Sequence, residues 1–179
     1  MGLLPAGGGC KEMLRRWRDG DDEASAISAA TTVFRLIGMG QTASSPEEAR
    51  PLRFLLERDC SSMNRDHLLV AARDRALAMA LDYVPPRAPG FAATGGAGAE
   101  KLSAVLERLQ KKGIMTPHDH TVGAQLVQVL CGGDRAAGEP VAEDDVLALE
   151  REAFLYLAGT PATIARIDYM REHGRPLRN

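Results

Sequence analysis

Apolar side chains recur at intervals of three and four residues along most of the chain, which is the spacing of one buried helix face. The first such run places Met13, Leu14 and Trp17 on one face of a helix that begins at Lys11 and ends at Asp19-Gly20. Residues 54–57 are predicted to form a brief strand. The pattern therefore predicts a mainly α chain.

Short polar motifs indicate where several of these helices begin. Ser45-Pro46-Glu47-Glu48 combines a capping serine, a proline in the first turn and a glutamate three residues after the cap. Thr116-Pro117 and Thr160-Pro161 place a capping hydroxyl before a first-turn proline. Spacing and caps together predict helices over residues 11–18, 21–37, 46–50, 65–84, 99–112, 117–130, 143–158 and from 161 onward.

One stretch interrupts the helical pattern. Residues 85–98 are rich in Pro, Gly and Ala and lack the periodicity of a core-forming element, which predicts a linker. Two helical lobes, residues 1–84 and 99–179, are expected on either side of it.

Composition excludes several classes of protein. The 179 residues carry a net charge of -2, and the few aromatic residues are not interleaved with basic ones, which argues against nucleic-acid binding. Cys10, Cys60 and Cys131 form no C-x-x-C pair, so we expect neither disulfides nor a zinc site but a reducing, cytoplasmic environment. No stretch approaches the length of a membrane-spanning helix.

The glycine-rich loop near the N-terminus is the first candidate for chemistry. Pro5, Gly7, Gly8 and Gly9 precede a helix start, where backbone N–H groups can bind an anion. A Walker-type loop is excluded because Lys11 is followed by glutamate instead of Ser or Thr. A dinucleotide fingerprint is excluded because no strand is predicted before the glycines. From spacing alone a tight turn is the commoner explanation.

Other polar groups have structural interpretations that we prefer. His118 and His120 lie two residues apart in the first turn of a helix and do not converge on one metal ion, so exposed capping residues are expected. The carboxylates between 143 and 157 are expected to lie on the solvent face of an amphipathic helix. No nucleophilic triad can be assembled, and no catalytic residue is assigned.

Arginines gather near the C-terminus. Arg166, Arg171, Arg175 and Arg178 could face a phosphate group or an acidic surface, and a solvated last helix is the competing interpretation.

Two ends of the chain together resemble a known family. Gly174-Arg175-Pro176-Leu177-Arg178-Asn179, with 149–155 and 159–161, is similar to the terminus of large bacterial 3-hydroxyacyl-CoA dehydrogenases that are fused to a crotonase-like enoyl-CoA hydratase domain. The start, 2–14, resembles the Pro-Gly turn in the second half of that crotonase domain. Residues 63–69 and 130–134 resemble the same family, so the resemblance covers essentially the whole chain in order.

The resemblance implies a place in fatty-acid β-oxidation. It implies the C-terminal helical portion of a crotonase-like domain (1–84) followed by a helical C-terminal lobe (99–179). NAD and acyl-CoA are implied for the full-length family, whereas this chain is expected to bind no cofactor, because the family's catalytic residues precede the matched region. An alternative register places a crotonase oxyanion hole at Gly7-Gly8-Gly9-Cys10, with Lys11 where a glutamate is required. The residues that follow favour the Pro-Gly turn.

Two functional hypotheses remain open. The first is a fragment of the bifunctional enzyme that is inactive alone and contacts acyl-CoA only within the full enzyme. The second is a stand-alone helical assembly or binding subunit that completes a crotonase-like partner. If the chain is a fragment, the segment 27–36 is expected to expose apolar surface, with self-association or a crotonase-type oligomer as the consequence.

Overall fold

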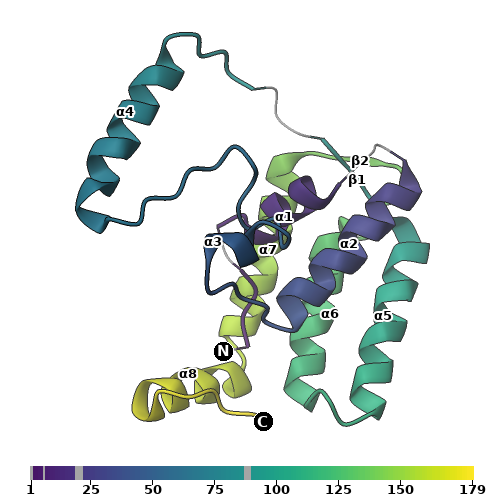
Figure 1. The fold of residues 1–179 in the computed structure, drawn as a ribbon. Helices are drawn as coiled ribbons and strands as arrows, with labels where there is room; N and C mark the ends of the chain where they lie inside the picture. The colour runs from purple at the N-terminus through teal and green to yellow at the C-terminus, as the bar shows by residue number, and fades with distance from the viewer. Residues whose placement is uncertain (1, 6, 19–21, 87–89) are drawn as a thin grey trace. The chain divides into compact units, whose positions relative to one another are not determined.

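The computed structural model describes residues 2–5, 7–18, 22–86 and 90–179. Within these residues the chain forms eight α-helices, one short 3-10 helix and one pair of two-residue strands, which confirms the mainly α prediction (Figure 1). The elements in chain order are α1 (Gly9–Trp17), α2 (Glu23–Gly38), α3 (Pro46–Ala49), η1 (Arg65–His67), α4 (Leu68–Ala80), β1 (Phe91–Ala92), α5 (Gly95–Lys111), α6 (Pro117–Cys131), β2 (Pro140–Val141), α7 (Glu143–Ala158) and α8 (Pro161–His173).

The chain separates into two compact units. The core unit comprises Met1–Gln41 and Pro89–Asn179, and the insert unit comprises Thr42–Ala88. This division differs from the predicted one, because residues on both sides of 85–98 belong to the core unit. The predicted boundaries followed local composition, whereas the units are defined by contacts between residues far apart in sequence.

The prediction of a linker is wrong for residues 91–98. Phe91 is buried and pairs with Val141 of β2 in an antiparallel register, and α5 already begins at Gly95. The small residues serve close packing: a Cβ on Gly98 would lie 2.2 Å from Thr94 Oγ1. A two-residue strand is too short to show a period, which is why the pattern missed it. Residues 87–89 lie outside the described residues.

Helices α2, α5 and α6 lie side by side and form the centre of the core unit (Figure 1). The fully buried side chains include Val33 of α2, Leu102 of α5 and Leu126 of α6. The prediction that the segment 27–36 exposes apolar surface is therefore wrong, because α6 packs against α2 and covers it.

Local signals placed most helix starts correctly. The side-chain oxygens of Ser45, Thr116 and Thr160 each accept a hydrogen bond from a backbone N–H in the first turn, as the capping motifs predicted. The bounds of α7 agree with the predicted 143–158. Helix α1 ends at Trp17, and the predicted stop at Asp19-Gly20 lies outside the described residues.

The insert unit carries little core of its own. The predicted strand at 54–57 is wrong: these residues lie in turns, where Arg50 donates hydrogen bonds to the carbonyls of Leu56 and Asp59. Asp59 in turn accepts from the Leu56 N–H, so side chains satisfy the backbone groups that a strand would pair. Helix α4 ends at Ala80, short of the predicted 84, and every residue from 60 to 86 is exposed.

Candidate functional site

The glycine-rich loop holds an anion that belongs to the protein itself. Glu150 of α7 accepts hydrogen bonds from the backbone N–H groups of Gly8 (2.8 Å) and Lys11 (2.7 Å) at the start of α1. This is the anion-binding geometry of a helix N-terminus, with an internal carboxylate as the anion. Nearby, Lys11 Nζ forms an ion pair with Glu143.

The four residues predicted to form a substrate-pocket loop shape this contact. Gly7 and Gly8 have φ values of 74° and 91°, which a residue with a side chain adopts only with strain. A Cβ on Gly9 would lie 2.6 Å from Pro5 Cβ, so glycine allows the loop to close on itself. The described contacts of the loop position Glu150, and its role towards a substrate stays a prediction.

Burial governs the chemistry of the groups around the loop. Burial raises the pKa of Glu150, and the hydrogen bonds from Lys11 and Gly8 offset only part of that rise. The Cys10 thiol has its pKa raised by burial and by the nearby Glu150 charge, so Cys10 is neutral and unreactive. The prediction that the carboxylates of α7 are all exposed is wrong for Glu150, which is 2% exposed.

Sequence spacing contains the signal that would have found Glu150. It follows Val146 by four residues and precedes Ala153 and Leu157 by three and seven, and all three of these residues are buried. A carboxylate on the apolar stripe of a helix indicates a buried, hydrogen-bonded group.

A second buried group connects the last helix to the start of α6. Arg166 donates to Asp119 Oδ1 (2.7 Å), to Thr116 Oγ1 (3.0 Å) and to the side chain of Asn179 (2.7 Å). Burial raises the pKa of Asp119, but hydrogen bonds from Thr116 and Arg166 outweigh it and the net pKa is lowered. Arg166 therefore holds a helix cap and the chain end together.

His118 belongs to a buried hydrogen-bonded chain. Its Nε2 lies 2.8 Å from Thr163 Oγ1, and Thr163 donates its single hydroxyl proton to the carbonyl of Gly2 (2.9 Å). Nε2 must therefore carry a proton and donate it to Thr163. The prediction of an exposed capping histidine is wrong, because His118 is 7% exposed. Burial, followed by the charge of Arg166, lowers the pKa of His118.

The four C-terminal arginines do not form one cluster. Arg171 lies 3.6 Å from Asp168 with both side chains exposed, and Arg175 lies 5.8 Å from the ring centroid of Tyr169. Arg166 and Arg178, in contrast, line the same cavity. The structure brings together only these two of the four predicted residues.

That cavity has a volume of about 680 Å³ and lies wholly within the core unit. The C-terminal end of α2, the C-terminal part of α5, the first half of α6 and residues 2–4 form its walls. Its apolar lining includes Leu3, Phe34, Ile37, Val105, Leu109 and Val122. Arg35 and Arg108 join Arg166 and Arg178 at its edge, and sequence reasoning missed both because they lie far apart in the chain.

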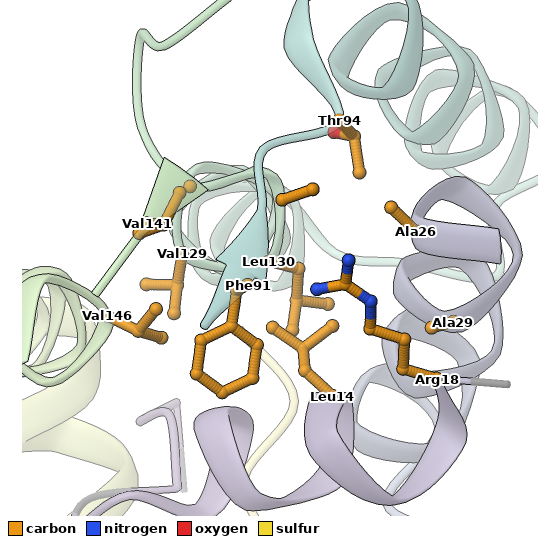
Figure 2. Close-up of a pocket in the computed structure, with 12 residues that line it drawn as sticks. Leu14, Arg18, Ala26, Ala29, Phe91, Thr94, Val129, Leu130, Val141 and Val146 are labelled. Atoms are coloured by element: carbon orange, nitrogen blue, oxygen red, sulfur yellow. The ribbon is translucent and has the colours of Figure 1, made fainter. Parts of the chain in front are cut away.

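A second, small cavity of the core unit lies between residues of α1, α2, α6 and the strand pair (Figure 2). Side chains such as Leu14, Phe91 and Leu130 surround it, and its volume is about 20 Å³. A space of that size holds about one water molecule and no substrate. Among the described residues, no group of three or more His, Cys, Asp or Glu side chains is placed to hold a metal ion. No described helix is long and apolar enough to span a membrane.

Comparison with known proteins relates the chain to a bacterial dehydrogenase. The chain is 35% identical over 181 aligned residues to a probable 3-hydroxyacyl-CoA dehydrogenase of Bacillus subtilis (strain 168). The match covers 100% of this chain and 23% of the relative, so the chain spans less than a quarter of the relative's length. No family model and no solved structure matches the chain.

Proposed function

We propose that this chain is the C-terminal helical part of an NAD-dependent 3-hydroxyacyl-CoA dehydrogenase of fatty-acid β-oxidation that also carries a crotonase-like enoyl-CoA hydratase segment. The observation that carries the proposal is the 35% identity, over the whole chain, to a probable 3-hydroxyacyl-CoA dehydrogenase. Because the match takes up only 23% of that relative, we propose that the chain completes a longer enzyme and does not catalyse alone.

The hydrogen bonds of the buried polar groups support the proposal that this chain does not catalyse alone. Glu150 is held by the N–H groups of Gly8 and Lys11, and Arg166 is held by Asp119 and by the chain end. Each of these groups has a structural partner, so each stabilises the fold. The groups that transform the substrate are then expected in the remaining part of the enzyme.

The residues of the glycine-rich loop do not fit NAD. A dinucleotide site needs glycine N–H groups that face a pyrophosphate at the start of a helix, directly after a strand. Here the N–H groups of Gly8 and Lys11 already donate to Glu150, and no strand precedes them among the described residues. NAD is therefore proposed for the longer enzyme only, and no step through it involves this chain.

Enzyme assays on a chimaera test the proposal. Three proteins are compared: the chain alone, the Bacillus subtilis relative without its matching segment, and that shortened relative joined to this chain. NADH formation from 3-hydroxybutyryl-CoA and hydration of crotonyl-CoA are measured for each. We expect no turnover by the chain alone, impaired turnover by the shortened relative, and recovery in the chimaera.

The control is the shortened relative rejoined to its own segment at the same junction. Turnover by the purified chain alone would contradict the proposal. A chimaera that folds as the control does, yet is no more active than the shortened relative, would contradict it as well.

The exposure of α4 favours a second candidate, a helical assembly subunit that completes a crotonase-like partner. Met63, Leu69 and Leu81 are more than 80% exposed, and α4 has no buried residue. Apolar surface of this kind is typical of a segment that another protein surface covers. Size-exclusion chromatography with the co-expressed shortened relative distinguishes the candidates: a stable complex of two separate chains supports the subunit, whereas activity that requires a covalent junction supports the C-terminal part.

A further inference from the structure

The cavity of about 680 Å³ in the core unit has the size of a small-molecule site. Pockets that bind small ligands in proteins have volumes of roughly 300–1,000 Å³ and are mainly apolar, with a few polar groups that orient the ligand. Three of the apolar side chains that line the cavity pack on the core and remain partly accessible to solvent: Val105, Val122 and Ile37. A ligand in the cavity would remove this apolar surface from water.

The charges around the cavity are strongly unbalanced. Four arginines and one aspartate line it, and Arg166 pairs with the aspartate, Asp119, at 2.7 Å. The positive charges of Arg35, Arg108 and Arg178 are therefore not balanced by an acidic residue of the lining. All three side chains are exposed, and no carboxylate among the described residues forms an ion pair with any of them. Arg178 is anchored by a hydrogen bond of 2.7 Å to the carbonyl of Ile114, which keeps its guanidinium at the cavity.

This combination selects one class of ligand. Guanidinium groups bind carboxylates and phosphates through paired hydrogen bonds and repel cations. The apolar walls favour an aliphatic chain over a polar body. We infer that the cavity binds an amphipathic anion, with its aliphatic chain against the apolar lining and its carboxylate or phosphate held by Arg35, Arg108 and Arg178. The inference uses contacts within the core unit alone and does not depend on the proposed function.

Isothermal titration of the purified chain tests the inference with four probes that share a ten-carbon chain. Decanoate, decyl phosphate and decanoyl-CoA carry anionic groups, and decanol is the neutral control; each is used below its micelle-forming concentration. We expect saturable binding of the anions with decanol at least about tenfold weaker, since charge-assisted hydrogen bonds are lost. If decanoyl-CoA binds more tightly than decanoate, the ligand of the cavity is a CoA thioester. If decanoate binds more tightly, the ligand is a free fatty acid.

Variants connect the binding to this cavity. Arg35→Gln with Arg108→Gln is expected to weaken decanoate about tenfold or more and to leave decanol unchanged. Val122→Phe fills the apolar part and is expected to weaken every probe. Arg151→Gln, at an exposed arginine of α7 that does not line the cavity, is the matched control and leaves binding unchanged. Circular dichroism confirms that each variant is folded. Absence of saturable binding, decanol as tight as decanoate, or equal losses in the double variant and the Arg151 control would each overturn the inference.

Discussion

Glu150 lies on the buried stripe of α7, where a carboxylate is costly unless hydrogen-bond donors replace water. The backbone N–H groups of Gly8 and Lys11 are donors that the start of α1 would otherwise leave without partners. The carboxylate therefore satisfies the helix start, and the helix start stabilises the buried charge. One side chain connects segments that are 142 residues apart in the chain.

Replacing Glu150 with alanine should leave both N–H groups unsatisfied and open a small cavity beside Cys10. We expect the free energy of unfolding to fall by about 2–4 kcal/mol, because two buried backbone donors lose their hydrogen-bond acceptor. Urea unfolding followed by circular dichroism measures the change. Glu152→Ala, at an exposed position of the same helix, should change stability by less than about 0.5 kcal/mol. Equal losses in the two variants would contradict a structural role for Glu150.

The pH dependence of stability should reveal His118. Its folded pKa lies below the ordinary value of 6.5, so between those two values the unfolded chain binds a proton that the folded chain does not. The free energy of unfolding should therefore decrease as pH falls from 6.5 towards the folded pKa. His118→Gln keeps an N–H donor at the Nε2 position and should flatten this part of the profile. Urea unfolding at several pH values below 6.5 provides the measurement.

Glu150 also contributes to the pH dependence of stability in this experiment. Its effect has the opposite sign to that of His118 and has to be subtracted. Its pKa is raised above the ordinary 4.5, so its contribution to stability is full below 4.5 and is lost as pH rises through the folded pKa. Both proteins contain Glu150, and the difference between their profiles isolates His118. Parallel profiles would contradict the burial of a neutral imidazole.

Sequence alone identified some of these residues and not others. Glycines before a helix start make the loop a candidate anion-binding geometry, although spacing alone favours a tight turn. For its partner Glu150 the charge of the side chain predicts a place in solvent, whereas its position on the apolar stripe of α7 indicates burial. Arg35 and Arg108 carried no local signal, since their shared cavity exists only once α2 and α5 pack together.

At the scale of elements, the sequence predicted helix starts better than it predicted contacts. Capping depends on residues within one turn, so Thr116 and Thr160 were sufficient to place α6 and α8. The linker prediction for the segment before α5 is wrong because runs of Gly and Ala occur both in flexible linkers and where two backbones pack closely in a core. Only a tertiary contact distinguishes the two cases, and Gly95 supplies one, because a Cβ there would lie 2.6 Å from the backbone nitrogen of Ala137.

Gly123 illustrates the same point and leads to a prediction. A Cβ at this position of α6 would lie 2.3 Å from Leu106 Cδ1 of α5, and Leu106 is 2% exposed. Gly123→Ala should therefore lower the free energy of unfolding by about 1–2 kcal/mol, because overpacking outweighs a gain of about 1 kcal/mol in helix propensity. Thermal and urea unfolding measure the effect.

The control for Gly123 is Gly96→Ala, in α5. No atom of the described residues lies within 4 Å of a Cβ there, so alanine should be neutral or stabilising by up to about 1 kcal/mol. The variant with both Gly123→Ala and Leu106→Ala should lose less stability than the sum of the two single losses, which gives a favourable coupling energy in a double-mutant cycle. Strictly additive losses would show that the two side chains do not compete for one space.

At the scale of the whole molecule, the core unit is closed by contacts between its first and last segments. Thr163 donates to the carbonyl of Gly2, and Glu150 accepts from Gly8, so the described residues of the first segment, 2–5 and 7–11, pack against α7 and α8. Periodicity cannot reveal such pairings, because each helix shows only that one face is buried and not what covers it. This is why the predicted division at 85–98 differs from the observed units.

The described residues of the insert unit from Cys60 onward make no such contacts, and the response of this segment to protease should follow from that. Local opening of α4 breaks no buried contact, so its opening free energy should be near zero. Trypsin should therefore cleave first after Arg65, Arg73 or Arg75, and more slowly after Lys101, which lies in the packed helix α5. Mass spectrometry of early fragments identifies the sites.

The same digestion measures whether α4 is covered in a longer enzyme. If the apolar surface of α4 packs against the upstream part of the dehydrogenase, cleavage at these three arginines should slow by at least about tenfold in the chimaera, because proteolysis tracks the population of the open segment. Cleavage after Lys101 should change little, since α5 is already packed in the chain alone. Equal rates at the three arginines in both proteins would mean that α4 remains exposed in the chimaera, and its apolar residues would then require a separate partner.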